Sequence, residues 1–139
     1  KVAGNMVKII EEFKNQMPFL GICLGHQAIG YAHNAKISKM KKVMHGRTDN
    51  ILKTKNTPIF KNIPKSFIAT RYHSLEISKY NLPKDIEILA LSANNIIMAI
   101  KIKNKPIFGI QFHPESYATE YGKIIFKNFI HICLKKRML

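Results

Sequence analysis

The sequence predicts an α/β fold in which a layered sheet, mixed or parallel, is flanked by helices. Helical and strand-like patterns alternate over residues 3–34, strand-like segments follow over residues 36–114, and a helical pattern closes the chain. The 139 residues are about the length of one domain, with an ordinary balance of 46% hydrophobic and 22% charged residues. We therefore expect one globular domain over residues 1–139.

A helix, a strand, a sharp turn and a second helix are expected at the start of the chain. Apolar positions recur at helical spacing over residues 3–16, as in an amphipathic helix: Met6, Ile9, Ile10 and Phe13. The run FLGI over residues 19–22 is short and apolar, which is typical of a strand buried in a parallel sheet. Residues 24–34 resume helical character, so Cys23 falls in the turn between strand and helix.

Strand-like segments separated by Asn, Pro and Gly occupy the middle of the chain, over residues 36–53, 66–74, 86–93 and 96–114. In the last of these, Met98, Ile100 and Ile102 alternate with small or charged residues in a period-two pattern. Gly109 is expected to break the final strand near its end. A closing helix over residues 119–134 has a broad apolar face that would pack on the sheet.

The net charge is strongly positive, +15 at pH 7, but the composition does not indicate a nucleic-acid binder. Most of the cations are lysines scattered along the chain, whereas base readout favours arginine and single-strand binding favours exposed aromatic residues. No apolar segment is as long as a membrane span, and no signal region is recognisable. The two cysteines, Cys23 and Cys133, do not make a disulfide framework. We expect a cytoplasmic protein that binds neither nucleic acid nor membrane.

Cys23 is the first candidate functional residue. Gly21 and Gly25 flank it at two residues on either side, so backbone and substrate could closely approach a side chain held on a strand-to-helix turn. A thiol at a helix N-terminus also gains from the helix dipole and free N–H groups, which lower its pKa and favour the thiolate. Taken alone, the residue fits a nucleophile and a small buried hydrophobic residue equally well.

The second candidate is the pair His113 and Glu115 in GIQFHPES, residues 109–116. His113 follows an apolar strand, and Glu115 could lie on the same side of the strand end, with Pro114 holding the bend rigid. A cysteine nucleophile needs a base to take its proton, and that imidazole needs a partner on its other nitrogen. Cys23, His113 and Glu115 could fill these roles, although a His-x-Glu pattern in isolation usually marks a solvated loop.

Neither a metal site nor a phosphate loop is indicated. The remaining histidines are not spaced with cysteines or carboxylates as a metal site requires, and LGHQAIG lacks the glycine spacing that cradles a nucleotide. We therefore expect no metal and no cofactor.

The chain resembles the class I, or triad, glutamine amidotransferases in several multi-residue motifs that follow the family's order along essentially the whole chain. The motifs are GICLGHQ around Cys23, RYHSL over residues 71–75 and FHPES over residues 112–116. The resemblance implies the family's fold and hydrolysis of the side-chain amide of L-glutamine through a thioester on Cys23. His113 would then act as acid and base, Glu115 would orient His113, and the ammonia would be delivered to a synthase partner.

Further site residues are implied by the same resemblance. The Leu24 backbone N–H would be one oxyanion donor. Gln27 would contact the substrate glutamine, and Ser74 and Leu75 would bind its amino-acid end largely through backbone groups. The remaining motif histidines are interpreted as structural residues or supports of the site: His26 and His73.

Within the family, RYHSL, KVMHGRTDNI and PESYATEYGK are similar to the branch whose synthase partners use chorismate. Anthranilate and aminodeoxychorismate are the candidate products, and residues 94–116 favour anthranilate. The resemblance then implies a hetero-oligomer with anthranilate synthase component I, the chorismate-binding synthase partner, in tryptophan biosynthesis, with no cofactor in this subunit. The aminodeoxychorismate branch of folate biosynthesis and a degenerate, non-catalytic interaction module stay open as alternatives.

The chain departs from the family pattern in places. Asn34 and Ala35 stand where the family usually has paired glycines, although Asn tolerates a left-handed backbone. In the family, residues that resemble KVAG at 1–4 come after the first strands and after a glycine-rich loop that supplies the second oxyanion donor. The resemblance therefore implies a type-1 amidotransferase domain over residues 1–139 that is incomplete at its N-terminus. If these residues were the whole protein, glutamine hydrolysis would be slow or absent, because one oxyanion donor contributes roughly 10²–10³ in rate.

Overall fold

A six-stranded sheet with the order β1-β6-β5-β4-β2-β3 organises the structure, a computed structural model that describes residues 4–138. β1 and β6 run parallel to each other, and all other neighbouring strands are antiparallel. The predicted α/β class with a mixed sheet is confirmed. The strands are β1 (Phe19–Ile22), β2 (Ile37–Lys53), β3 (Ser66–Ile77), β4 (Ile86–Ser92), β5 (Ile97–Ile102) and β6 (Ile107–Ile110).

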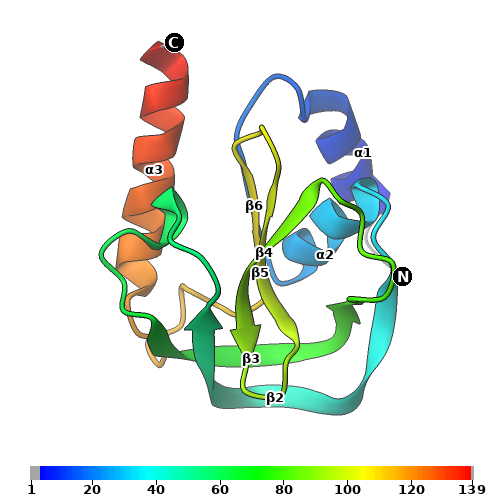
Figure 1. Ribbon diagram of the computed structural model, residues 1–139, viewed down its shortest axis with the longest axis vertical. Helices are drawn as coiled ribbons and strands as arrows, with labels where there is room; N and C mark the ends of the chain where they lie inside the picture. The colour runs from blue at the N-terminus through cyan, green and yellow to red at the C-terminus, as the bar shows by residue number, and fades with distance from the viewer. Residues whose placement is uncertain (1–3, 139) are drawn as a thin grey trace.

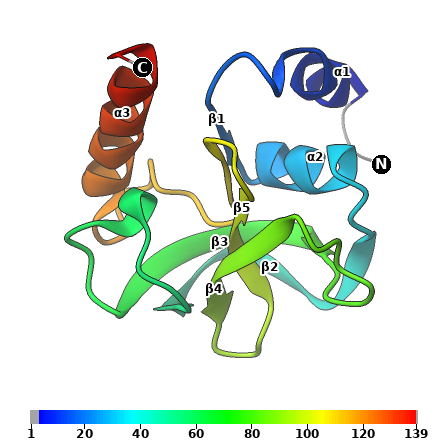
Figure 2. The ribbon, with the colours of Figure 1, turned by 45° about the horizontal axis from the view of Figure 1, so that its top comes forward.

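Helices cover the sheet from both sides (Figures 1 and 2). The two N-terminal helices lie together beside β1 and β6, while the C-terminal helix stands on the other side of these strands (Figure 2). A sheet enclosed in this way buries both faces of its inner strands, which explains why β6 and most of β5 are apolar and buried, whereas the edge strand β1 is only partly buried. The helices are α1 (Gly4–Phe13), α2 (Leu24–Ala32), the short 3-10 helix η1 (Pro58–Phe60) and α3 (Gly122–Met138).

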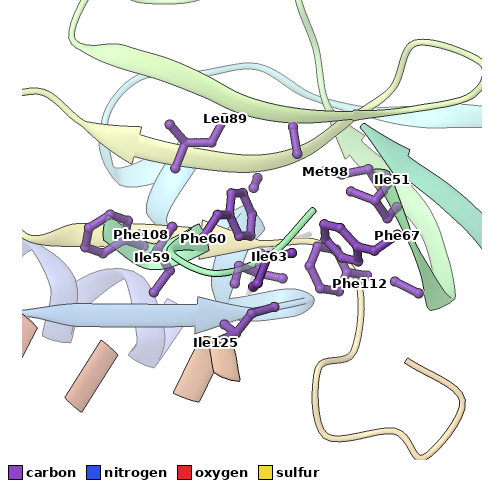
Figure 3. Close-up of a cluster of buried hydrophobic side chains, with 14 residues drawn as sticks. Ile51, Ile59, Phe60, Ile63, Phe67, Leu89, Met98, Phe108, Phe112 and Ile125 are labelled. Carbon is purple, nitrogen blue, oxygen red and sulfur yellow. The ribbon is translucent and has the colours of Figure 1, made fainter. Parts of the chain in front are cut away.

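The two faces of the sheet carry two separate clusters of buried hydrophobic side chains. One cluster joins η1 and α3 to the strands, and its aromatic residues Phe60, Phe67 and Phe112 pack together (Figure 3). The other lies beneath α1 and α2 and includes Ile10 and Ile29 from these helices. Full burial of a side chain of this size contributes about 1.5–3 kcal/mol, so both helical layers are held mainly by apolar contact.

The predicted helices are present with shifted ends. The first ends at Phe13 instead of residue 16, and its predicted start at Ala3 lies outside the described residues. Its apolar face is also less buried than predicted. Only Ile10 is buried, whereas Met6 is 39% and Ile9 is 52% exposed, because α1 rests on α2 rather than on the sheet. The closing helix begins at Gly122 instead of residue 119, since Tyr121 has a positive φ of 61° that no helix accommodates.

Of two expectations about the last strands, one is confirmed and one is corrected. The strand predicted from the alternation around Ile100 is present as β5, and Met98, Ala99 and Ile100 are all fully buried because β5 is central and covered on both faces. Gly109 does not break its strand, since β6 continues through it to Ile110. The glycine serves packing instead: a Cβ at this position would lie 2.7 Å from Nδ1 of His26 on α2.

Asparagines take the left-handed backbone positions at several turns of the chain. Asn34, which follows α2, has φ 72°, so the expectation that Asn can replace a glycine there is confirmed. Asn side chains tolerate this conformation better than other non-glycine residues. The same geometry occurs at further turns: Asn62, Asn81, Asn95 and Asn104.

A glycine contact sets how closely α2 approaches β1. A Cβ on Gly21 would lie 2.5 Å from the backbone carbonyl of Gly25 and 2.6 Å from Cδ1 of Ile29. No real side chain fits at such distances. By contrast, a Cβ on Gly25 would meet no atom within 4 Å.

We predict that Gly21→Ala lowers the free energy of unfolding by about 1–3 kcal/mol, because the added methyl forces α2 away from β1. Urea denaturation followed by circular dichroism measures the loss. Gly25→Ala is the matched control and should leave stability unchanged or raise it by up to about 1 kcal/mol through helix propensity. Equal stability of the two variants would contradict the packing argument.

Candidate active site

Cys23 occupies a strained turn between β1 and α2. Its φ of 54° and ψ of −102° are unusual for a residue with a side chain, and such backbone strain costs on the order of 1–3 kcal/mol. The backbone N–H donates to the carbonyl of Ile110 at 2.7 Å, which extends the pairing of β1 with β6 by one residue. The turn therefore places the thiol at the carboxyl end of the parallel pair β1–β6, between the end of β1 and the start of α2.

The environment of the thiol raises its pKa. Partial burial is the main cause, and the nearby Glu115 carboxylate acts in the same direction. Hydrogen bonds from the Leu24 backbone N–H and the Gln111 amide lower the pKa without offsetting the burial. The expectation that the helix N-terminus leaves Cys23 with a lowered pKa is thus wrong, because desolvation outweighs the helix. A nucleophile in this position needs a base to remove its proton.

His113 and Glu115 form the orienting pair that the sequence predicts. Nδ1 of His113 lies 2.6 Å from the Glu115 carboxylate. A proton on Nδ1 donates to this carboxylate and leaves Nε2 as an acceptor. Nε2 is buried and has no hydrogen-bond partner among the described residues. This nitrogen is the one available to accept a proton.

Strand β3 brings the histidine and the cysteine to the same place. The thiol of Cys23 donates to the backbone carbonyl of Tyr72 at 3.4 Å, and the Tyr72 ring packs edge-on against the His113 imidazole with centroids 5.4 Å apart. The His113 backbone N–H donates to the Thr70 carbonyl at 3.0 Å, and the Thr119 hydroxyl donates to the His113 carbonyl at 2.7 Å. The described residues show no direct hydrogen bond between thiol and imidazole, and catalytic contacts often tighten only when substrate is present.

The residues predicted to bind glutamine surround the same turn. The Gln27 side chain is only 3% exposed, and its Nε2 donates to the Leu75 carbonyl and to Oε1 of Gln111, both at 3.1 Å. Ser74 is exposed and lacks a partner in the β2–β3 ladder, because β2 bulges away between Lys39 and Met44. The substrate contacts of Gln27, Ser74 and Leu75 stay predictions.

The Leu24 backbone N–H lies in the first turn of α2, directly after Cys23, so it points from a helix N-terminus toward the turn. A hydrogen bond from this N–H is one of the causes that lower the pKa of the Cys23 thiol. Its role as an oxyanion donor stays a prediction. Among residues 4–138, no three histidine, cysteine or carboxylate side chains are grouped as metal ligands, and no helix there has the length and apolarity to cross a membrane.

A buried ionic network supports β3 behind the site. Arg71 is 1% exposed, and its guanidinium donates to Asp49 at 2.6 Å and, through Nε, to Nε2 of His73 at 3.1 Å. Since the Arg71 Nε can only donate, His73 is neutral and carries its proton on Nδ1, which donates to the Leu75 carbonyl at 2.9 Å. Burial is the main cause that lowers the pKa of His73 to about 4.

His26 lies in α2 against Gly109 and is fully buried. Neither ring nitrogen has a hydrogen-bond partner of good geometry among the described residues, and burial lowers its pKa to about 3. The ring is therefore neutral at physiological pH. This placement agrees with the interpretation of His26 as a packing residue.

Sequence reasoning did not assign roles to Tyr72 and Gln111, although both contact the Cys23 sulfur. Gln111 directly precedes the FHPES motif, and its position at the end of a strand was the only available signal. Tyr72 acts through its backbone carbonyl, which no side-chain pattern reveals.

The chain matches the family model described as glutamine amidotransferase class-I over residues 1–133. It is 46% identical to anthranilate synthase component 2 from Pyropia yezoensis over 129 residues, covering 92% of this chain and 68% of that protein. It is 45% identical to the bifunctional protein TrpGD from Thermotoga maritima over 130 residues, covering 94% of this chain and 22% of that protein.

Among solved structures, the chain is similar to a putative GMP synthase protein from Thermoplasma acidophilum, with a TM-score of 0.86 and 33% sequence identity. The match covers 95% of this chain and 66% of that chain. The chain thus spans about two thirds of the length of this structure and of the Pyropia relative, and a smaller share of the bifunctional one.

The strained turn predicts an unusual order of stability among substitutions at Cys23. Cys23→Gly should be about 1 kcal/mol more stable than Cys23→Ala, because glycine adopts a positive φ without steric cost while alanine retains the Cβ. Thermal unfolding of both variants measures the difference. If Cys23→Ala were the more stable variant, the turn would not be strained.

The buried histidines predict a loss of stability in mild acid. The pKa values of His26 and His73 lie below the 6.5 of an ordinary histidine, so the unfolded chain takes up protons first as the pH falls. Stability is fully present above pH 6.5 and falls below it by about 1.4 kcal/mol per pH unit for each histidine. Urea denaturation between pH 7 and 5 should show a shallower slope for His26→Asn, whereas His131→Asn on the exposed face of α3 should keep the original slope.

Proposed function

Because the chain belongs to the class I glutamine amidotransferase family, we propose that it supplies ammonia from L-glutamine to a chorismate-binding synthase partner, in the role of an anthranilate synthase component 2. The observation that carries the proposal is the pairing of His113 with Glu115 beside a cysteine held on a strained strand-to-helix turn. A structural cysteine needs neither a base nor a positive φ.

The first half of the reaction forms a thioester on Cys23. The raised pKa keeps the resting residue a thiol, so Nε2 of His113 accepts its proton as the sulfur attacks the side-chain amide carbon of glutamine. Glu115 holds the imidazole through Nδ1 and stabilises the imidazolium that forms. The Leu24 N–H donates to the oxygen on which negative charge develops. The carbon–nitrogen bond then breaks, and the imidazolium gives its proton to the departing ammonia.

The second half regenerates the thiol. His113 takes a proton from water as the water oxygen attacks the thioester carbon, and the carbon–sulfur bond breaks to release glutamate. His113 then gives this proton to the sulfur, which restores the thiol of Cys23. The sequence of steps needs no cofactor in this protein. Gln27 and the backbone of Ser74 and Leu75 hold the substrate glutamine in this proposal, which the ladder-free backbone of Ser74 supports.

The proposed partner is the one that the names of the relatives suggest. Anthranilate synthase component 2 is the name of several relatives that are 45–46% identical over about nine tenths of this chain. We propose the same role here, with anthranilate synthase component I as the partner in a cytoplasmic hetero-oligomer, where a free thiol stays reduced. Ammonia must reach the partner before water protonates it, so docking is part of the mechanism.

The test compares nitrogen donors in the full-length protein combined with anthranilate synthase component I and chorismate. Anthranilate fluorescence is followed with glutamine or with ammonium as the donor. Cys23→Ala should reduce the glutamine-dependent rate by at least about 10³-fold, because no other group can form the thioester, and should retain the ammonium-dependent rate.

Cys133→Ala is the matched control, because the second cysteine lies on α3 and should leave both rates unchanged. Glutamine-dependent anthranilate production by Cys23→Ala would refute the mechanism. Glutamine-dependent synthesis with an aminodeoxychorismate synthase partner but not with anthranilate synthase component I would assign the other branch, and a wild-type protein without any glutamine reaction would support a non-catalytic binding module.

A further inference from the structure

Two buried glutamine amides lie side by side beneath the nucleophile. Gln111 directly follows β6 and is fully buried, and Gln27 on α2 is nearly so. Nε2 of Gln27 lies 3.1 Å from Oε1 of Gln111, and Nε2 of Gln111 lies 3.8 Å from Sγ of Cys23. The backbone N–H of Gln111 donates to the Met98 carbonyl at 2.9 Å, so the main chain beneath this amide is held by β5.

The hydrogen bonds fix the orientation of both amides. The Leu75 carbonyl can only accept, so the atom of Gln27 that contacts it must be the NH₂ group. The same NH₂ group faces Gln111, which must therefore present its carbonyl oxygen to Gln27. The NH₂ group of Gln111 is then the part that faces the sulfur. If either amide were rotated by 180°, two donors or two acceptors would face each other.

The sulfur thus has different partners in its two protonation states. As a thiol, Cys23 donates its proton to the Tyr72 carbonyl. As a thiolate, it can only accept, and the available donors are the Gln111 amide and the Leu24 N–H. The negatively charged group that opposes ionisation is Glu115, and His113, whose ring packs against Tyr72, is the titratable group on the same side.

We infer that Gln111 stabilises the Cys23 thiolate by donating a hydrogen bond from its side-chain amide, and that Gln27 is a positioning residue which holds this amide toward the sulfur. The inference rests on the proposed function for the nucleophilic role of Cys23. It gives Gln27 a task that is independent of any contact with substrate. The lowering of the Cys23 pKa by the Gln111 hydrogen bond supports the geometry.

The test is the pH dependence of iodoacetamide alkylation in the absence of glutamine, read at Cys23 by mass spectrometry. Gln111→Met keeps the length of the side chain but removes the donor, so the midpoint of the profile should move upward by about one pH unit. Gln27→Met should move it in the same direction by a smaller amount. The double variant should match Gln111→Met alone, because Gln27 affects the pKa of the Cys23 sulfur only through Gln111.

Asn128→Leu is the matched control for a merely structural effect. Asn128 is another buried amide, and it donates to the carbonyls of Ile59 and Lys61 at 2.9 Å, in the packing of α3 against η1. Its loss should lower stability without moving the midpoint. An unchanged midpoint in folded Gln111→Met, or an equal shift in Asn128→Leu, would overturn the inference.

A second measurement uses the wild-type protein and needs no variant at position 111 to fold. In ¹H–¹⁵N spectra, the Gln111 side-chain amide signal should titrate with the Cys23 alkylation midpoint, and this step should vanish in Cys23→Ala. An amide signal that ignores Cys23 would also overturn the inference. Alkylation requires no turnover, so an absent glutamine reaction with an intact midpoint shift would refute only the proposed function.

Discussion

The close approach of α2 to the parallel pair β1–β6 is the constraint on which the candidate site depends. Gly21 and Gly109 are partners in the register of this pair, and each lacks the Cβ that would strike α2. Gly21 admits the backbone of Gly25, and Gly109 admits the ring of His26. The first turn of the helix therefore begins directly above the strand ends. Cys23 has to bridge a very short gap, and its positive φ is the result.

The polar groups around the turn form one directional network instead of a set of independent contacts. Arg71 can only donate, which makes His73 a donor to the Leu75 carbonyl, and the same carbonyl orients Gln27. Gln27 in turn fixes the orientation of the Gln111 amide, whose NH₂ group faces the sulfur. The amides of Gln27 and Gln111 and the imidazole of His73 each find their partners in one arrangement only, and a buried polar group without a partner is costly. The Leu75 carbonyl, which accepts from both His73 and Gln27, thereby joins α2 to β3.

Local patterns explain why much of this arrangement could be predicted from the sequence. The FLGI run, the flanking glycines and the His-x-Glu spacing each express their geometry within a few residues, so β1, Cys23 and the His113–Glu115 pair follow from short stretches. Gln111 could not be identified in this way, because its partner Gln27 lies 84 residues away. Arg71 is similar: a buried guanidinium becomes acceptable only because β2 places Asp49 beside it.

The same reasoning explains the corrected expectations. Whether a strand is covered on one face or two depends on its position in the sheet, which the alternation around Ile100 does not encode. The pKa of Cys23 depends on the sum of burial and a distant carboxylate, and a helix N-terminus alone gives the wrong sign. The exposed side of α1 likewise reflects its placement on α2.

The bond from the Cys23 thiol to the Tyr72 carbonyl has a consequence for how the protein withstands oxidants. Peroxides attack thiolates, and sulfenic acid formation follows the thiolate fraction of a cysteine. A resting sulfur that shares its proton with a carbonyl, in a partly dry site, offers little thiolate to such oxidants. The Cys23 sulfur is consequently protected from oxidative damage while it stays protonated.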